Sequence, residues 1–213
     1  NPDPPLSSHV SIGNTSHNQK VKTSVSINYA TSKTDFLSQD LTNKALFLPP
    51  NAPALYSGDG SLNWQGWDTS GAFENPIAYL QRRYEANMNN MISSMEVSYA
   101  ILPNLEIKSR AGYTNTTLEA VKLTPVSSLA PAIASGSVNN ASFSKSDFKN
   151  WIIEPQLNWR PDIGTGQFDL LIGTQFLDQT MDGIAETASG FSSEALMKNI
   201  AAAPTRGVGS NYY

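Results

Sequence analysis

The 213-residue chain contains no cysteine. Disulfide bonds, thiolate metal sites and a cysteine nucleophile are therefore excluded within it. It has only two histidines, His9 and His17, and no acidic ligands stand near them in the sequence to complete a metal site. We recognise no Ser/His/Asp arrangement, so the sequence suggests no enzyme, no cofactor and no bound metal.

Long hydrophobic runs and an excess of positive charge are also missing. No apolar run approaches the roughly 18 residues of a membrane helix, which excludes a helical span. The net charge of −4 gives no electrostatic reason to expect nucleic-acid binding. Charged residues make up only 15% of the chain, while Ser, Thr, Asn and Gln are abundant, as is typical of β-structure with polar loops. A membrane barrel stays possible, because its strands alternate between apolar and polar residues.

The clearest pattern is an alternation in residues 148–160 that resumes in residues 167–180. Its apolar positions share one face of each segment and are Trp151, Ile153, Pro155, Leu157 and Trp159, then Phe168, Leu170, Ile172 and Phe176. The link between the segments is rich in turn formers, including Gly164 and Gly166. A period of two on both sides of such a link predicts a β-hairpin of long strands.

The aromatic residues on the apolar face are spaced as in an outer-membrane barrel. Trp151 and Trp159 lie eight positions apart, roughly 26 Å along a strand and about 20 Å along the membrane normal for a tilted strand, close to the separation of two aromatic girdles. The predicted lipid-facing girdle comprises Tyr99, Tyr113, Trp151, Trp159, Phe168 and Phe176. The predicted lumen-facing polar residues are Glu96, Glu106, Lys108, Arg110 and Glu154. Periodicity alone does not distinguish this barrel from a soluble sandwich.

Two further hairpins are predicted, one from residues 6–13 and 20–31 and one from residues 91–101 and 105–113. Long loops separate the hairpins at residues 39–73 and 118–147, and a third long segment follows Asp182. All the short turns then lie at one end of the strands and all the long loops at the other. Short periplasmic turns with long extracellular loops are typical of outer-membrane barrels.

Two short helices are expected inside the loops. Asn75-Pro76 suits a helix start, with Ile77, Leu80 and Tyr84 at helical spacing. A second short helix is predicted at residues 193–202, with Ser192 as its N-cap. Gly58-Asp59-Gly60 predicts a tight turn rather than a calcium loop, because the other acidic ligands of such a loop are missing.

Several segments carry a family resemblance. LPPNAPALY (residues 48–56), a Gly-Asp-Gly turn, LNW (62–64), ENPIAYL (74–80) and ILPNLEIKSRAGY (101–113) together resemble the barrel region of SusC/RagA-type TonB-dependent transporters. The resemblance covers essentially the whole chain. Its most specific parts are the proline-rich loop with the later Asn-Pro and the Leu-Pro-Asn-Leu turn.

The resemblance implies an all-β fold of antiparallel long-stranded hairpins, one segment of a 22-stranded barrel with a separate N-terminal plug. Residues 1–213 would supply about six strands, with the plug and the other strands absent. It also implies a Gram-negative outer-membrane location and import of oligosaccharides, peptides or other nutrients. The implied partners are membrane lipid, a SusD-like surface lipoprotein and TonB, which would act through the plug.

Tyr56, Trp64 and Trp67 fall on the first long loop and are the candidate ligand-binding residues. Flat aromatic faces stack on sugars or side chains, although the same rings can simply anchor a loop. A second hypothesis for the whole chain is a secreted all-β carbohydrate-binding module with these aromatics as its site. A glycosidase using Glu96, Glu106 or Glu154 ranks well below both, because nothing in their spacing indicates a catalytic pair.

Overall fold

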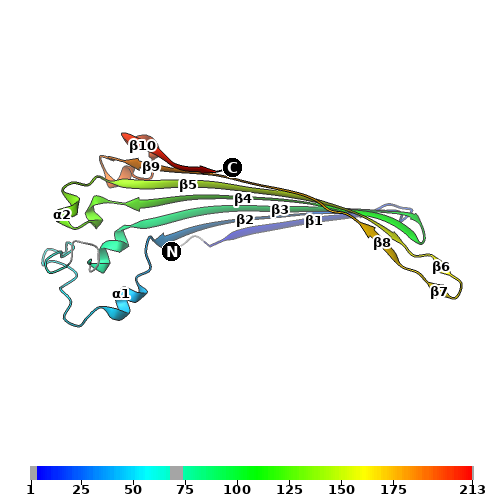
Figure 1. Ribbon diagram of the computed structural model, residues 1–213, viewed down its shortest axis with the longest axis horizontal. Coiled ribbons are helices and arrows are strands. Elements are labelled where there is room, and N and C mark those ends of the chain that lie inside the picture. The colour runs from blue at the N-terminus through cyan, green and yellow to red at the C-terminus, as the bar shows by residue number, and fades with distance from the viewer. Residues whose placement is uncertain (1–3, 68–73, 213) are drawn as a thin grey trace.

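The structure is a computed structural model that describes residues 4–67 and 74–212. Its main feature is one long, curved, antiparallel sheet (Figure 1). The strands of its main path are, in spatial order, β1 (Leu6–Thr15), β2 (Val21–Leu37), β3 (Arg83–Leu102), β4 (Leu105–Thr124), β5 (Asn140–Trp159), β9 (Phe176–Ser189) and β10 (Thr205–Tyr212). The all-β prediction is therefore confirmed. The number of strands in a complete barrel stays a prediction.

The short turns and the long connections lie at opposite ends of the sheet (Figure 1). At one end, residues 16–20 join β1 to β2, and Pro103-Asn104 joins β3 to β4 in a two-residue turn. The small hairpin of β6 (Asp162–Ile163) and β7 (Gly166–Gln167) lies at the same end. The predicted glycine turn is present there, with Gly164 at a φ of 64°.

The long connections at the other end carry short helices. Residues 38–82 contain α1 (Thr42–Phe47) and the 3₁₀ helix η1 (Pro76–Gln81), residues 125–139 contain η2 (Val126–Ser128) and α2 (Pro131–Ala134), and residues 190–204 contain η3 (Glu194–Leu196) and η4 (Ile200–Ala202). The helix predicted after Asn75-Pro76 is η1, and the Asn75 side chain accepts a hydrogen bond from the N–H of Ile77. Tyr84, however, belongs to β3.

The single helix predicted at residues 193–202 is wrong. The segment forms two separate 3₁₀ turns, and the cap of the first is Ser193, whose hydroxyl accepts from the N–H of Ala195, not Ser192. Asn199 caps the second turn by accepting from the N–H of Ala201. Asn199 thus interrupts a continuous helix, because its backbone is extended and its side chain caps a new turn.

Several strands are longer than their apolar periodicity predicts. β4 runs to Thr124 and β5 begins at Asn140, so the loop predicted at residues 118–147 shrinks to residues 125–139. β9 likewise runs to Ser189, and β10 was not predicted. In these extensions apolar residues such as Leu118 and Phe143 lie on opposite faces and are mixed with polar ones, so backbone pairing continues where the one-sided apolar pattern fades. The pairing of Glu119 in β4 with Lys145 in β5 is one example of such a polar pair.

The strand predicted at residues 167–180 is interrupted. β8 (Leu170–Gly173) and β9 pair with β5 in one unbroken register, with Gln156 opposite Gly173 and Ile153 opposite Phe176. The gap lies opposite Pro155, which has no N–H to donate, although its carbonyl accepts from the N–H of Thr174 at 3.1 Å. One proline therefore divides one strand into two.

The two edges of the sheet are stepped. β1 pairs with β2 only over Lys22 to Thr31, the part near the turns, while β10 pairs with β9 only over Gly183 to Ser189, the part near the loops. The central strands β3, β4 and β5 pair along nearly their whole length.

The buried core is small and lies at the loop end. Leu123, Ala141 and Ala188 of the sheet pack with Phe191, Met197 and Ala203 of residues 190–204, which fold over one face of the strands. Among the described residues, no helix is long and apolar enough to cross a membrane.

Candidate functional sites: an apolar belt and a groove between loops

Cross-strand register gathers the predicted apolar residues on one side of the sheet, here called the belt face. Residues directly opposite in adjacent strands share a face, so all side chains in one row across the sheet point to the same side. One row contains Val21, Tyr99, Ile107, Leu157 and Ile172, and another contains Val25, Met95, Ala111, Ile153 and Phe176. These rows, with the intervening row and the flanking Trp151 and Trp159, form the apolar belt of the half of the sheet near the turns.

Of the six aromatic residues predicted to form a girdle, all but Phe168 lie in the sheet. Tyr99, Tyr113, Trp151, Trp159 and Phe176 lie on the belt face by register, and each is 37–55% exposed. Phe168 lies between β7 and β8, outside the sheet ladder, where its N–H donates to the carbonyl of Pro161. No second layer of the described residues covers the belt, which leaves an exposed apolar surface across several strands.

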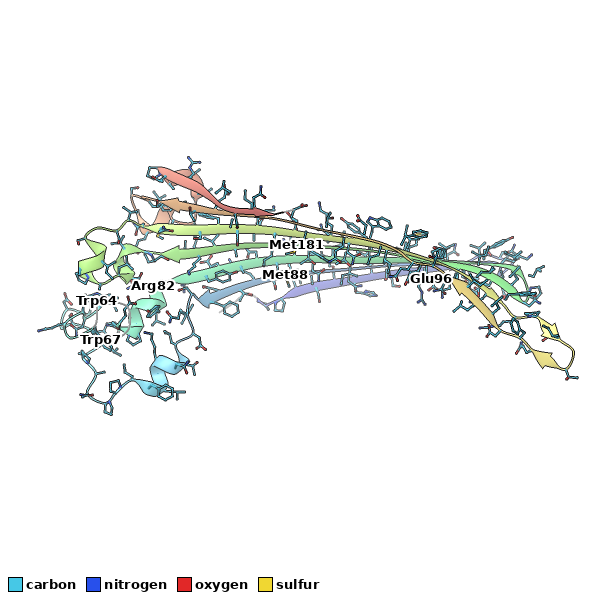
Figure 2. The ribbon with its side chains drawn as sticks, in the orientation of Figure 1. Trp64, Trp67, Arg82, Met88, Glu96 and Met181 are labelled. Carbon is cyan, nitrogen blue, oxygen red and sulfur yellow. The ribbon has the colours of Figure 1, made fainter. Side chains whose placement is uncertain are left out.

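The opposite face near the turns carries the charged residues predicted to face a lumen. Glu96, Arg110 and Glu154 lie directly opposite one another on β3, β4 and β5. Glu96 accepts from Lys108 Nζ and from Arg110 Nε, each at 2.7 Å. Glu106 shares this face, two positions from Lys108. The structure thus joins Glu96, Lys108 and Arg110 into one ion-pair cluster on this face; Figure 2 labels Glu96.

Polarity on both faces changes along the strands. Farther toward the loops the belt face becomes charged, with Lys145 Nζ bonded to Glu119 Oε1 at 2.9 Å. The opposite face there becomes partly apolar and includes Met88, Leu118 and Met181; Figure 2 labels Met88 and Met181 in the middle of the sheet. The expectation of one apolar and one polar side along each whole strand is therefore too simple.

A groove forms between the loops of residues 38–82 and 125–139. A tight turn places Tyr56 opposite Leu62, with the N–H of Gly60 donating to the carbonyl of Ser57 and Gly60 at a φ of 83°. The predicted Gly58-Asp59-Gly60 turn is thus confirmed. The groove has a volume of about 670 Å³ and is lined by Tyr56, Gly60, Ser61, Leu62, Trp64, Ile77, Leu80, Gln81, Ser127 and Pro131.

The three candidate ligand-binding aromatics separate into two kinds. Tyr56 and Trp64 line the groove, and Tyr56 is exposed. Trp67 is only 5% exposed, and its indole Nε1 donates to the carbonyl of Ala54 at 3.1 Å. Its ring therefore anchors the loop and presents no open stacking face, so the prediction of Trp67 as a ligand-binding residue is not supported.

Asn75 is the polar centre of the first loop. It is fully buried, and its Nδ2 donates to the carbonyls of Leu55 at 2.7 Å and Asn63 at 2.9 Å. Its Oδ1 accepts from the N–H of Ile77 at 3.0 Å. One amide thus satisfies backbone groups from both sides of the groove's aromatic turn and from η1, which holds the lining in place.

Arg82, which is labelled in Figure 2, joins the first loop to the second. Its Nε donates to Ser128 Oγ at 3.1 Å and its Nη2 donates to the Ser128 carbonyl at 2.8 Å. Its guanidinium also lies over the ring of Tyr79, 4.5 Å from the ring centre, and 3.6 Å from Glu74. Burial, followed by the hydrogen bond to Glu74, raises the pKa of the Tyr79 hydroxyl, which keeps it a donor in this cluster.

Sequence reasoning missed the groove residues that carry no pattern of their own. Gln81 and Ser127 come from different loops, and Ser127 Oγ donates to Gln81 Oε1 at 2.9 Å. Neither has a sequence signal that predicts this meeting. The Asn-Pro at the start of η1 was visible, but only the structure shows that Asn75 also bonds two distant carbonyls.

Comparison with known proteins adds no family assignment: the sequence matches no protein-family model and no curated protein.

Proposed function

We propose that this chain forms part of the wall of an outer-membrane β-barrel, in a TonB-dependent importer of oligosaccharides or other nutrients. Long loops at the outer surface capture the ligand, which then passes through a water-lined lumen. The mechanism is conformational and needs no covalent chemistry. A SusD-like lipoprotein and TonB are the partners that the family resemblance implies.

The observation that carries this proposal is the exposed apolar belt. It lies in the half of the sheet near the turns, spans several strands and has aromatic residues near both of its limits, Trp159 toward the turns and Trp151 toward the loops. A lipid-facing band flanked by aromatic residues has this form. Beyond Trp151 the belt face carries Lys149, Asp147 and Lys145, which suits strands that continue above the membrane into water.

The charge distribution of the opposite face supports the same proposal. Behind the belt, the Glu96, Lys108 and Arg110 cluster lies where a lumen wall would be, and it pairs its own charges. Such ionic groups tolerate a wet or filled lumen but not hydrocarbon. The two faces at this level therefore suit two different surroundings.

The test is residue-by-residue accessibility in the full-length protein in outer membranes. Because the chain has no cysteine, each introduced cysteine is unique within these 213 residues. We expect a membrane-impermeant maleimide to label Ile184→Cys and Phe47→Cys on intact cells and to leave Ile153→Cys unlabelled. Gly164→Cys should react only after the outer membrane is permeabilised. Equal labelling of Ile153→Cys and Ile184→Cys on intact cells would contradict the proposal.

A secreted all-β carbohydrate-binding module is the second candidate, and the loop groove is the observation that favours it. The groove lies entirely in the loops and needs no membrane to form. A module, however, would have to cover the belt with some other layer. Full-length protein found in the soluble secreted fraction, with no detergent requirement, would favour the module over the barrel.

A further inference from the structure

We infer that the groove between the two loops is a binding site for a neutral saccharide, with Tyr56 and Trp64 as its stacking surfaces. This inference rests on the proposed function for its place in ligand capture and specifies which ligand class the loops take. Its volume of about 670 Å³ lies within the range of small-molecule sites. Two aromatic side chains meet neutral polar groups in one concave surface.

The aromatic part of the lining suits the apolar faces of sugar rings. A pyranose presents C–H groups on its flat faces and hydroxyls at its rim, so it needs an aromatic floor with polar groups beside it. Tyr56 is about half exposed, and the Tyr56–Leu62 pairing fixes the turn that carries it. Buried Trp67 and Asn75 hold the same loop from below, so the site is formed before a ligand arrives.

The polar part of the lining can serve sugar hydroxyls. Ser61 Oγ donates to Asp59, and Ser127 Oγ donates to Gln81 Oε1, so both hydroxyl oxygens keep lone pairs that can accept from a ligand. Among residues 4–67 and 74–212, Gln81 Nε2 has no hydrogen-bond acceptor and can donate to a ligand. The lining thus offers both donors and acceptors, as a hydroxyl-rich ligand requires.

The charge of the lining selects against ionic ligands. None of the ten lining residues is Lys, Arg, His, Asp or Glu. Two acids bond to lining residues and are thereby engaged, Asp59 with Ser61 and Glu194 Oε1 with the N–H of Ser127 at 3.4 Å. A charged ligand would lose water without gaining a counter-ion, whereas a neutral sugar would not incur this cost. We therefore expect neutral sugars to bind better than uronic acids.

The test measures binding of three probes to the full-length protein by calorimetry: a neutral gluco-oligosaccharide, an oligogalacturonate and a neutral apolar tripeptide. We expect only the neutral saccharide to bind appreciably. Trp64→Ala and Tyr56→Ala should each weaken its binding about tenfold, through loss of one stacking face. Gln81→Ala should weaken it by a smaller factor, about fivefold.

Phe47→Ala is the matched control. Phe47 is an aromatic residue in the same loop, is 79% exposed and does not line the groove, so its removal should leave saccharide affinity unchanged. Heat-dependent mobility of each variant on gels reports whether the barrel has folded. Loss of binding in a folded Trp64→Ala protein but not in Phe47→Ala supports the inference.

Two results would overturn the inference: tighter binding of the tripeptide or the oligogalacturonate than of the neutral saccharide, or saccharide binding that is unaffected in folded Tyr56→Ala and Trp64→Ala. The barrel proposal and the groove inference can fail separately, and the results distinguish the two cases. A water-soluble protein that binds the saccharide through Trp64 would refute the membrane wall while supporting the groove. A folded membrane barrel without saccharide binding would refute the groove alone.

Discussion

The two halves of the same strands differ in the side chains that their faces carry. Near the turns, β3 and β4 expose apolar residues such as Tyr99 and Ile107 on the belt face and bear the ion pairs of Glu96 on the other. Near the loops, the belt face carries ion pairs such as Lys145–Glu119, and the opposite face includes Met88 and Met181. The backbone ladder is continuous through both halves, so the difference between them lies in the side chains and not in the backbone hydrogen bonds.

The largest expected effect comes from a substitution within the belt that leaves the charged half of the strands unchanged. Ile153→Arg in β5 should impair membrane assembly by about 2–4 kcal/mol, because in the proposed barrel it places a guanidinium at lipid depth. Ile184→Arg in β9 is the matched control on the same face, since Ile184 has a similar exposure and lies opposite Lys145. It should change stability by no more than about 0.5 kcal/mol. Denaturant titration of the protein in lipid vesicles measures both, and equal effects would contradict the division of the face.

The second effect tests whether the loops are ordered independently of the belt. Asn75→Ala removes three hydrogen bonds and leaves the Leu55 and Asn63 carbonyls without this partner, which should cost about 1–3 kcal/mol of local stability. We expect faster protease cleavage within residues 50–67 and an unchanged stability of the sheet. Asn51→Ala, at an exposed site of the same loop, should cleave at the original rate. A barrel that unfolds with the loop would refute this independence.

A smaller effect concerns the ion-pair cluster behind the belt. Glu96→Gln removes the charge that Lys108 and Arg110 share, while keeping a side chain of the same shape. We expect a loss of about 1 kcal/mol or less, because the cluster is partly exposed and screened by salt. Stability measured at low and high salt should differ less in this variant than in the parent. A loss as large as that of Ile153→Arg would mean that the cluster lies in a dry interior.

The smallest effect is a pH dependence confined to the loop end. The hydroxyl and then the N–H of Ser61 donate to Asp59 and lower the pKa of its carboxyl. A carboxyl with a lowered folded pKa stabilises the turn above its unfolded pKa, and this contribution is lost as pH falls through the folded value. Saccharide binding should thus stay constant from about pH 8 to about pH 5 and decline only in stronger acid. A decline between those two values would implicate another group.

Much of the fold followed from alternation, but only where one face is apolar. The segment around Trp151 and Ile153 was predicted as a strand because every second side chain is apolar. Residues 118–124 instead place apolar residues such as Leu118 and Leu123 on opposite faces, so the one-sided alternation is lost and the segment was predicted as a loop. β10 was missed for the same reason, and Gly207 and Gly209 weaken its pattern further. Pro155 fitted the alternation, yet its missing N–H divides the partner strand.

The candidate site was predictable only in its aromatic members. Tyr56 and Trp64 are conspicuous in any loop, but their separation from Trp67 depends on burial, which no local pattern encodes. Gln81 and Ser127 meet because Arg82 holds the second loop against the first. Such contacts between distant loops arise from tertiary packing, and a single sequence gives no sign of them.

The stepped edges of the sheet limit how any neighbouring strand can join it. A strand added beside β1 meets β1 over one half of its length and the overhanging β2 over the other, and the same holds in mirror fashion at β10 and β9. Such a step favours one alignment. A slip of one residue would turn every side chain of the added strand to the opposite face of the sheet. The staggered edges therefore help to fix the register of any strand that extends this sheet.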